Sequence, residues 1–452
     1  MSTTISGRIP FVRLFVATLC LLMFLLQPAE SQTITVLHNF TGGPDGAFPE
    51  TGLVMDRAGN IYGVAEQSND GAGTVFKVAR HGGGWTLTTL RDFTPGSDGN
   101  YDDGAFPKKL VFGPDGALYG AATFGGGIGH CGDQHSLAGC GVIFKLTPPA
   151  QFCATVQCPW TETILYRFSG GDDGGSPSGP LVFDAAGNLY GTTIVGGTGA
   201  CAIYPGVNGC GVVFKLSHSN GDWTESALYS FADSPDGYWP SGGVVLDSSG
   251  NLYGVTRYGG LANGCYGTGC GIVFEISPVG SGWTEKILYT FQGTNDSGNP
   301  VGGLAFDPSG RLIGTTTGIG YYPYDSATVF MLAPSGGNWT FAVIYSDPGN
   351  YFGGSYDNLI ADTSGNLYAT APLDGNQSGY YDYGKVYKLT PSNGGWTETD
   401  LYVFTGIQQY GLTPEGSVSR DTDGNLYGST TYGGTGTCNG EGCGTLFELA
   451  SH

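Results

Sequence analysis

The sequence predicts an all-β fold, a seven-bladed β-propeller with four antiparallel strands in each blade. Three observations lead to this prediction. A repeat of four short apolar elements occurs seven times along the 452 residues. The elements are rich in Val, Ile, Phe and Tyr and end in turns with Gly, Asp or Asn. No segment shows a helical period of useful length. Four strands per repeat fit a propeller blade better than a solenoid coil, which is the structural alternative.

The clearest copy of the repeat lies within residues 181–231. Its elements, which we call A to D, are residues 181–184, 188–191, 212–216 and 223–231. An Asp-x-x-Gly-Asn turn or a similar one joins A to B, and Asp and Gly favour such turns. Continuous apolar elements are expected because both faces of a blade are buried against its neighbours. Across the chain, A is marked by Leu53, Leu110, Leu181, Val244, Leu304, Leu359 and Val418, B by Tyr62, Tyr119, Tyr190, Tyr253, Ile313, Tyr368 and Tyr427, C by Phe76, Phe144, Phe214, Phe274, Phe330, Tyr387 and Phe447, and D by Trp85, Trp160, Trp223, Trp283, Trp339 and Trp396.

Element D has six complete copies, whereas A, B and C have seven. The seventh D strand is expected at the N-terminus, because residues 35–40 align with the end of element D and Phe40 takes the place of Phe168 and Phe231. Residues 33–40 are therefore predicted to complete the last blade, beside the strands near residues 418, 427 and 447. Pairing the two ends of the chain removes an exposed sheet edge.

The N-terminus has the features of a secretory signal. Arg8 and Arg13 precede an apolar run from Leu14 to Leu26, which is short for a membrane span. We expect residues 1–31 to be a signal peptide and residues 32–452 to form a single propeller domain. The mature chain is then predicted to be extracytoplasmic, in the periplasm, at the cell surface or secreted.

The charge balance excludes two classes of partner. The chain has 38 Asp and Glu against 17 Lys and Arg, a formal charge of −21 at pH 7. Nucleic acids and anionic membranes are bound through a positive field, which this chain lacks. No segment after the N-terminal run has 18 continuous apolar residues, so no membrane span is expected in the mature chain.

The cysteines outside the N-terminal run form five close pairs. Export favours disulfides, each closing a small local loop. Zinc is the alternative, for which a site could be formed by His130, Cys131, His135 and Cys140. The predicted disulfides are Cys131–Cys140, Cys153–Cys158, Cys201–Cys210, Cys265–Cys270 and Cys438–Cys443.

Three recurring motifs carry a family resemblance. They are Leu189–Thr193, Gly196–Gly197 and Gly211–Leu216, and the match recurs at Tyr427–Gly434 with Gly444–Phe447. This combination resembles the GloVer tandem repeat of exported bacterial proteins, and the likeness covers nearly all of residues 33–450. The resemblance implies export and a repeat architecture. It implies no particular activity.

Antiparallel strand order divides the loops between two faces. The A–B and C–D loops lie on one face, and the B–C and D–A loops lie on the other. The second set is longer, and its D–A loops are acidic and rich in Gly and Pro. Residues that repeat in register, including the six Trp of element D, are expected to serve packing, whereas unrepeated polar or aromatic residues on the second face are candidates for binding.

The candidate binding residues are aromatic residues and Asp in three loops of that second face. Aromatic rings stack on the apolar faces of sugars and carboxylates accept hydroxyl hydrogen bonds, so these residues suit glycan recognition. The alternative is that the Tyr side chains pack loops that have no disulfide. The candidates are Tyr238 and Trp239, then Tyr321, Tyr322, Tyr324 and Asp325, and finally Tyr380, Tyr381, Asp382 and Tyr383.

The sequence favours an exported, non-catalytic binding module whose partner is a glycan or an extracellular protein. One alternative is an extracytoplasmic polysaccharide-active enzyme, a hydrolase or lyase, with acidic residues in the central depression of the same face. The other is a structural protein of the cell surface. No catalytic residue or metal ligand is predicted. We expect a monomer without a cofactor, with calcium bound by the acidic loops as the alternative.

Overall fold

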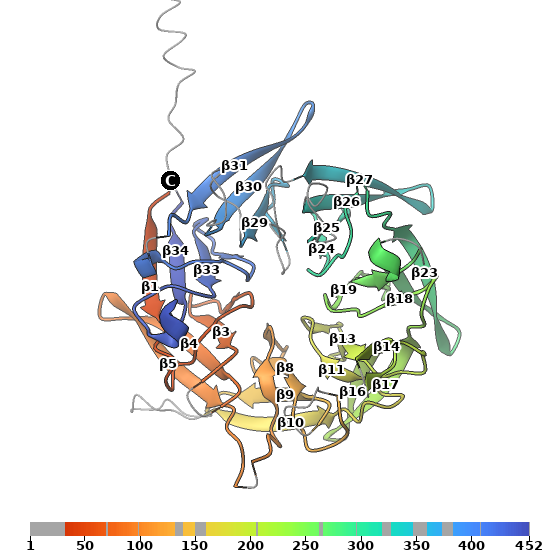
Figure 1. The fold of residues 1–452 in the computed structure, drawn as a ribbon, viewed down its shortest axis with the longest axis horizontal. Coiled ribbons are helices and arrows are strands. Elements are labelled where there is room, and N and C mark those ends of the chain that lie inside the picture. Colours follow the sequence, from red (N-terminus) through yellow and green to blue (C-terminus); the bar gives the residue numbers. More distant parts are fainter. Residues whose placement is uncertain are drawn as a thin grey trace, which may run out of the picture.

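A computed structural model shows a closed ring of seven antiparallel sheets among the residues it describes (Figure 1). These residues are 32–68, 71–97, 99–131, 139–149, 160–204, 207–261, 265–294, 296–318, 327–346, 359–372, 383–406 and 408–451. Each sheet follows the order A-B-C-D, with A nearest the centre of the ring and D at the rim. The predicted seven-bladed propeller is confirmed.

The strands of each blade follow the predicted elements. A strands are two or three residues long, and B, C and D strands have five to nine residues. The bounds are β2 (Val54–Met55), β3 (Ile61–Ala65), β4 (Thr74–His81) and β5 (Gly84–Asp92) in blade 1; β7 (Val111–Phe112), β8 (Leu118–Phe124), β9 (Val142–Thr147) and β10 (Thr161–Arg167) in blade 2; β12 (Val182–Phe183), β13 (Leu189–Val195), β16 (Val212–Ser219) and β17 (Asp222–Ser230) in blade 3; β19 (Val244–Leu246), β20 (Leu252–Thr256), β22 (Ile272–Val279) and β23 (Gly282–Thr290) in blade 4; β24 (Ala305–Phe306), β25 (Leu312–Thr316), β26 (Thr328–Ser335) and β27 (Asn338–Ser346) in blade 5; β28 (Ile360–Ala361), β29 (Leu367–Ala371), β30 (Lys385–Ser392) and β31 (Gly395–Val403) in blade 6; and β32 (Ser419–Arg420), β33 (Leu426–Thr430), β34 (Thr445–Leu449) and β1 (Ile34–Asn39) in blade 7.

The N-terminal strand closes the ring, as predicted. β1 pairs antiparallel with β34, with Ile34 opposite Leu449 and Val36 opposite Phe447. The register shifts between Val36 and His38, a bulge that recurs where the other D strands cross their C strands. Leu37, inside this bulge, is 8% exposed and packs in the core. The first and last described strands therefore share one sheet and leave no gap in the ring.

The core lies between blades and is built from repeated aromatic residues. In blade 4, the Phe274 ring is fully buried and meets the ring of Phe231, from the end of the preceding D strand, at 5.1 Å between centroids. A Cβ on Gly254 would lie 2.4 Å from Phe274, so this glycine is required for close approach. Equivalent ring pairs are Phe40–Phe76, Phe93–Phe144, Phe168–Phe214, Phe291–Phe330 and Phe404–Phe447.

The A–B turns are closed by a repeated aspartate. Asp184 accepts the backbone N–H of Ala186 and Asn188 at 2.9 and 2.8 Å, the Asn188 side-chain amide at 2.7 Å and the Tyr190 hydroxyl at 3.0 Å. Burial raises the pKa of Asp184, but these hydrogen bonds outweigh it and lower the pKa below its usual value. The same arrangement recurs at Asp56, Asp247, Asp362 and Asp421. These residues are turn formers.

Short strands and 3-10 helices lie in the loops of the second face. Four predicted disulfides are present there, and they indicate an oxidising, extracytoplasmic environment. Cys131 and Cys140 bond to each other, which overturns the zinc alternative. The pair Cys153–Cys158 and the expected signal peptide, residues 1–31, lie outside the described residues. The short elements are β6 (Ala105–Pro107), β11 (Gly175–Pro177), β14 (Ala202–Tyr204), β15 (Val207–Asn208), β18 (Gly237–Tyr238), β21 (Tyr258–Gly259), η1 (Cys265–Gly267), η2 (Gln408–Tyr410) and η3 (Cys438–Gly440).

Among the residues that the structure describes, no helix has the length and apolar character needed to cross a membrane.

Candidate functional site on the loop-rich face

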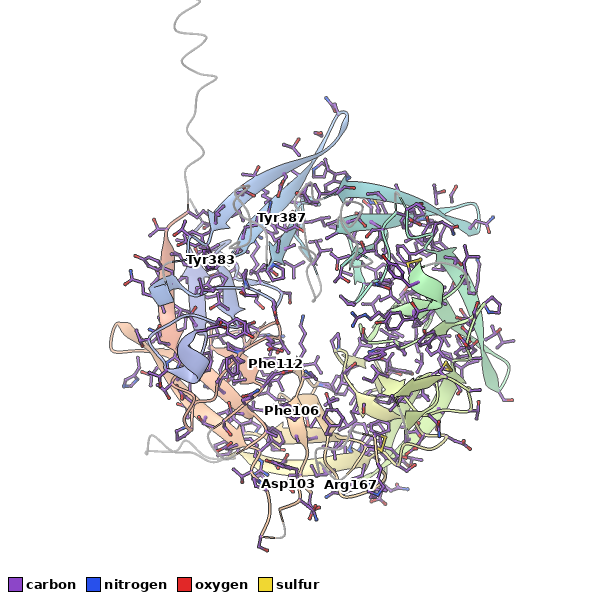
Figure 2. The ribbon with its side chains drawn as sticks, in the orientation of Figure 1. Asp103, Phe106, Phe112, Arg167, Tyr383 and Tyr387 are labelled. Carbon is purple, nitrogen blue, oxygen red and sulfur yellow. A yellow bond between two sulfur atoms is a disulfide. The ribbon has the colours of Figure 1, made fainter. Side chains whose placement is uncertain are left out.

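The second face carries the longer B–C and D–A loops, and we call it the loop-rich face. Its D–A loops run from the rim toward the centre of the ring. In blade 2, Asp103 and Arg167 lie at the rim, whereas Phe106, further along the same loop as Asp103, lies nearer the centre (Figure 2). Each D–A loop that the structure describes ends at a proline before strand A. The side chains beside this proline are therefore carried to the inner part of the face.

A repeated backbone arrangement holds the end of each loop. Trp239, which precedes Pro240, has φ of 63° and donates its N–H to the Cys210 carbonyl of the preceding blade at 3.1 Å. Its carbonyl accepts the N–H of Arg257, the residue after strand B, at 3.0 Å. A positive φ is unfavourable for a non-glycine residue, and these inter-segment hydrogen bonds stabilise it. The equivalent residues before proline are Phe48, Phe106, Ser176, Asn299 and Thr413, all with positive φ and the same inter-blade hydrogen bond.

Three side-chain positions sit on this repeated backbone in every blade except blade 6, whose D–A loop lies outside the described residues. We call them the pre-proline position, the post-proline position and the strand-end position, the last being the residue that follows the core of strand B. Their side chains differ from blade to blade although the backbone does not. The post-proline residues are Glu50, Lys108, Ser178, Ser241, Val301 and Glu415, and the strand-end residues are Glu66, Thr123, Ile194, Arg257, Thr317 and Thr431.

Three partly exposed aromatic rings gather on blade 4. Tyr238 and Tyr258 face each other in the β18–β21 pair, with ring centroids 5.3 Å apart and ring planes 30° from parallel. Trp239 lies edge-on to Tyr258 at 5.8 Å. We call these three residues the blade 4 aromatic group. Tyr266, in the B–C loop of the same blade, is 68% exposed. The structure thus brings the predicted candidates Tyr238 and Trp239 together with Tyr258, which the sequence reasoning missed.

Arg257 accompanies this group. Its guanidinium carbon lies 5.9 Å from the centre of the Trp239 ring and 5.3 Å from that of Tyr258. The buried Nε has no hydrogen-bond partner among the described residues, and no described carboxylate forms an ion pair with Arg257. Some cations of this acidic chain have a carboxylate partner, such as Arg80 with Glu448, whereas Lys77 and Lys215 lie over tyrosine rings as Arg257 does.

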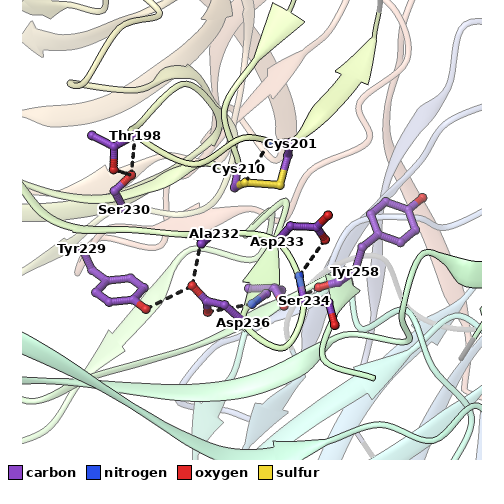
Figure 3. Close-up of a disulfide and its surroundings, with 12 residues drawn as sticks. Thr198, Cys201, Cys210, Tyr229, Ser230, Ala232, Asp233, Ser234, Asp236 and Tyr258 are labelled. Atoms are coloured by element: carbon purple, nitrogen blue, oxygen red, sulfur yellow. Dashed lines mark hydrogen bonds between the residues drawn. A yellow bond between two sulfur atoms is a disulfide. The ribbon is translucent and has the colours of Figure 1, made fainter. Parts of the chain in front are cut away.

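The acidic character of the D–A loops is largely structural. Asp236 accepts the hydroxyl of Tyr229 at 3.1 Å and the N–H of Ala232 at 2.8 Å, and these hydrogen bonds close the loop that leads into blade 4 (Figure 3). Asp233 accepts the N–H of Ser234 at 2.7 Å. The counterparts of Asp236 in other loops are Asp45, Asp173 and Asp296. These carboxylates act as turn formers.

A second group of charged side chains lies in blades 7, 1 and 2. Lys108 forms an ion pair with Glu66, and the negative charge of Glu66 acts on the Glu50 carboxyl. Burial, followed by the negative charges of Glu66 and Glu415, raises the pKa of Glu50 to about 9. Burial also raises the pKa of Glu415, and Glu66 raises it further. We call Glu50, Glu66, Glu415 and Lys108 the inner charged group.

Sequence reasoning missed the inner charged group, although a signal for it existed. The proline of the D–A loop repeats, and the residue after it is Glu in blades 1 and 7 and Lys in blade 2, but Ser or Val in blades 3 to 5. Comparing this column across blades would have drawn attention to Glu50, Lys108 and Glu415.

Tyr383 packs where other blades have a disulfide. It takes the place of the second cysteine of a pair, and its carbonyl accepts the N–H of Thr413 at 2.9 Å, as the Cys210 carbonyl does for Trp239. A Cβ on Gly406 would lie 2.4 Å from its ring. This placement favours the alternative that tyrosine replaces the disulfide. The candidates Tyr321, Tyr322, Tyr324, Asp325, Tyr380, Tyr381 and Asp382 lie outside the described residues.

The described residues contain no group of three or more His, Cys, Asp or Glu side chains arranged to hold a metal ion. Calcium binding stays a prediction.

The fold and the side chains of the loop-rich face together define the class of protein. The chain is a disulfide-bonded β-propeller with uneven side-chain chemistry on its loop-rich face. Residues 103–317 and 265–452 match the Gloeobacter/Verrucomicrobia repeat, and the chain belongs to this repeat family. The predicted family resemblance is thereby confirmed. A search of curated proteins found no match.

Solved structures share the general architecture at low identity. A Bacteroides uniformis protein provisionally named a 6-phosphogluconolactonase is 16% identical, with a TM-score of 0.47, covering 78% of this chain and 85% of its own. A Thermus thermophilus protein provisionally named an oxidoreductase (glucose dehydrogenase) is 14% identical, with a TM-score of 0.42, covering 92% and 99%. A Dyadobacter fermentans protein of unknown function is 13% identical, with a TM-score of 0.40, covering 83% and 100%. These names carry no information about the activity of this chain.

Proposed function

We propose that this protein is an exported binding module that holds a glycan on its loop-rich face through the blade 4 aromatic group. The observation that carries the proposal is the gathering of three partly exposed rings, with the Tyr258 ring centre 5.3 Å from that of Tyr238 and 5.8 Å from that of Trp239. Such rings offer flat apolar surfaces on which sugar rings stack. We propose that the protein acts as a monomer outside the cytoplasm.

The scaffold supports this proposal because it is rigid where the rings are attached. Tyr238 and Tyr258 are cross-strand neighbours, and Trp239 is fixed by two backbone hydrogen bonds. Little conformational entropy is then lost when a ligand is bound, which favours affinity. Binding groups on a rigid framework of strands are typical of functional loops.

A glycan array followed by calorimetry tests the proposal. Trp239→Ala and Tyr258→Ala are expected to weaken binding of the best array ligand about tenfold or more. The matched control is Phe106→Ala, which removes the aromatic ring at the pre-proline position of blade 2 and is expected to leave binding unchanged. Failure to bind any glycan would contradict the proposal, as would equal binding by wild type and Trp239→Ala.

The inner charged group supports a second candidate function, acid–base chemistry on a polysaccharide. Burial and the charges of neighbouring glutamates raise the pKa of Glu50 to about 9, and one of these glutamates, Glu66, forms an ion pair with Lys108. A proton donor beside a carboxylate base is the arrangement that such chemistry needs. Hydrolase or lyase activity would then be lost in Glu50→Gln and Glu66→Gln while glycan binding is retained. Absence of turnover across a panel of polysaccharides would contradict this second candidate function, and the binding function would remain.

A further inference from the structure

The blade 4 site holds a cation whose neighbours are aromatic rings. Arg257 occupies the strand-end position, where other described blades have Glu66, Thr123, Ile194, Thr317 or Thr431. Its guanidinium lies 5.9 and 5.3 Å from the rings of Trp239 and Tyr258. The group is therefore specific to this blade and is built into the aromatic surface.

This arrangement leaves hydrogen-bonding capacity unused among the described residues. A buried guanidinium N–H without an acceptor is unfavourable, and the Nε of Arg257 is in this state. The chain has 38 carboxylates for 17 Lys and Arg, yet none that the structure describes forms an ion pair with this guanidinium. A carboxylate supplied by a ligand would give this guanidinium the ion-pair partner that the described residues do not provide.

A guanidinium matches one ligand group particularly well. Its planar N–H donors form two parallel hydrogen bonds with a carboxylate, and a neighbouring aromatic ring attracts the cation. In a uronic acid the carboxylate projects from the edge of the sugar ring. A uronic acid stacked on Tyr258 or Trp239 would present its carboxylate toward the adjacent guanidinium.

We propose that the glycan bound by blade 4 contains uronic acid, and that Arg257 is the residue that selects its carboxylate. The inference rests on the proposed glycan-binding function and adds the chemical class of the ligand. The formal charge of −21 repels a polyanion at long range, so recognition depends on the local contact, and short uronic acid oligomers are the appropriate probe.

The test compares oligogalacturonides with the same oligomers after complete methyl esterification, which removes the charge and keeps the sugar. Isothermal titration is expected to show that wild type binds the acid form about tenfold tighter or more. Arg257→Gln is expected to bind both the acid and the ester form with the affinity that wild type has for the ester. Trp239→Ala is expected to lose binding of both forms. Arg80→Gln is the matched control, because Arg80 also lies over a tryptophan, 4.8 Å from the Trp85 ring, but on the C–D hairpin of the opposite face.

The outcomes separate the two proposals. Equal affinity of wild type for the acid and ester forms overturns the uronic acid inference while the glycan-binding function stands. Tighter binding of a sulfated than of a uronic acid oligomer also overturns it. No binding of any acidic, esterified or neutral glycan overturns both. If Arg257→Gln fails to fold, the comparison of acid and ester on wild type still decides, and Arg257→Lys, which keeps the charge without the planar donors, is expected to retain only part of the preference.

Discussion

Blades 1 and 4 use the same backbone for different purposes. Trp239 and Phe48 precede the loop proline with φ of 63° and 57°, and each carbonyl accepts the N–H of its strand-end residue, at 3.0 Å from Arg257 and 3.2 Å from Glu66. Phe48 is only 7% exposed and packs in the core, whereas Trp239 is partly exposed beside a cation. The repeat therefore determines the backbone, and the variable side chains determine what each blade can bind.

The two regions also differ in charge. Blade 4 presents a guanidinium among rings, and blades 7, 1 and 2 present three glutamates around one lysine. Blade 1, marked by β3, and blade 4, marked by β19, lie on different sides of the centre of the ring (Figure 1). A long glycan crossing the face would therefore meet two chemically distinct subsites.

The largest expected effect separates packing from binding at the pre-proline position. Phe48→Ala removes a buried ring, whose neighbour Tyr432 lies 5.6 Å away, and is expected to lower the free energy of unfolding by about 3 kcal/mol. Trp239→Ala is expected to cost about 1 kcal/mol, because that ring is only partly buried. Denaturant unfolding measures both. Equal destabilisation would remove the distinction between the two blades.

Glu50 at the post-proline position of blade 1 predicts a pH dependence that Ser241, at the same position of blade 4, does not. The folded-state pKa of Glu50 is raised to about 9, so its protonated form stabilises the fold below the unfolded-state pKa, and this contribution is lost as the pH rises toward 9. Glu50→Gln, which stays neutral, is expected to become more stable than wild type by on the order of 2 kcal/mol at pH 9 but not at pH 5.

Thermal unfolding at both pH values provides this comparison. Ser241→Ala changes the equivalent post-proline residue of blade 4 to one that also does not titrate, and it is expected to show no difference between the two pH values relative to wild type. A Glu50→Gln variant whose stability relative to wild type is independent of pH would show that Glu50 is ionised in the fold.

The repeated A–B turn predicts a smaller effect that is equal in different blades. Asp184→Ala and Asp247→Ala each remove the acceptor of two backbone N–H groups, and each is expected to lower the free energy of unfolding by about 1–2 kcal/mol. Neither is expected to change glycan affinity, since the A–B turns lie on the opposite face. A binding defect in either variant would contradict the assignment of the two faces.

The ring, its closure and four disulfides could be predicted because they depend on features that repeat. Phe40 could be placed by its likeness to Phe168 and Phe231, and the strand it ends pairs with β34 as the sequence indicates. Trp239 was singled out as unrepeated, yet its backbone position recurs in five other loops, and only its side chain is special. The sequence therefore indicates which side chain is unusual at this position, but not that the backbone conformation there recurs.

The parts of the site that were missed depend on contacts between segments. Tyr258 joins Tyr238 through the short β18–β21 pair, which interrupts the repeat and gives no alternating pattern of its own. Glu50 and Glu66 are 16 positions apart, and Lys108 comes from another blade, so only ring closure and loop geometry bring them together. The packing role of Tyr383 depends on Gly406, which no spacing rule connects to it.

The most direct measurement is a crystal structure of the protein with a bound oligosaccharide. We predict a sugar ring within about 4 Å of the Trp239 or Tyr258 side chain, with blade 4 providing most of the contacts. A sugar bound on the opposite face, or on the loop-rich face without any contact to Tyr238, Trp239 or Tyr258, would contradict the account.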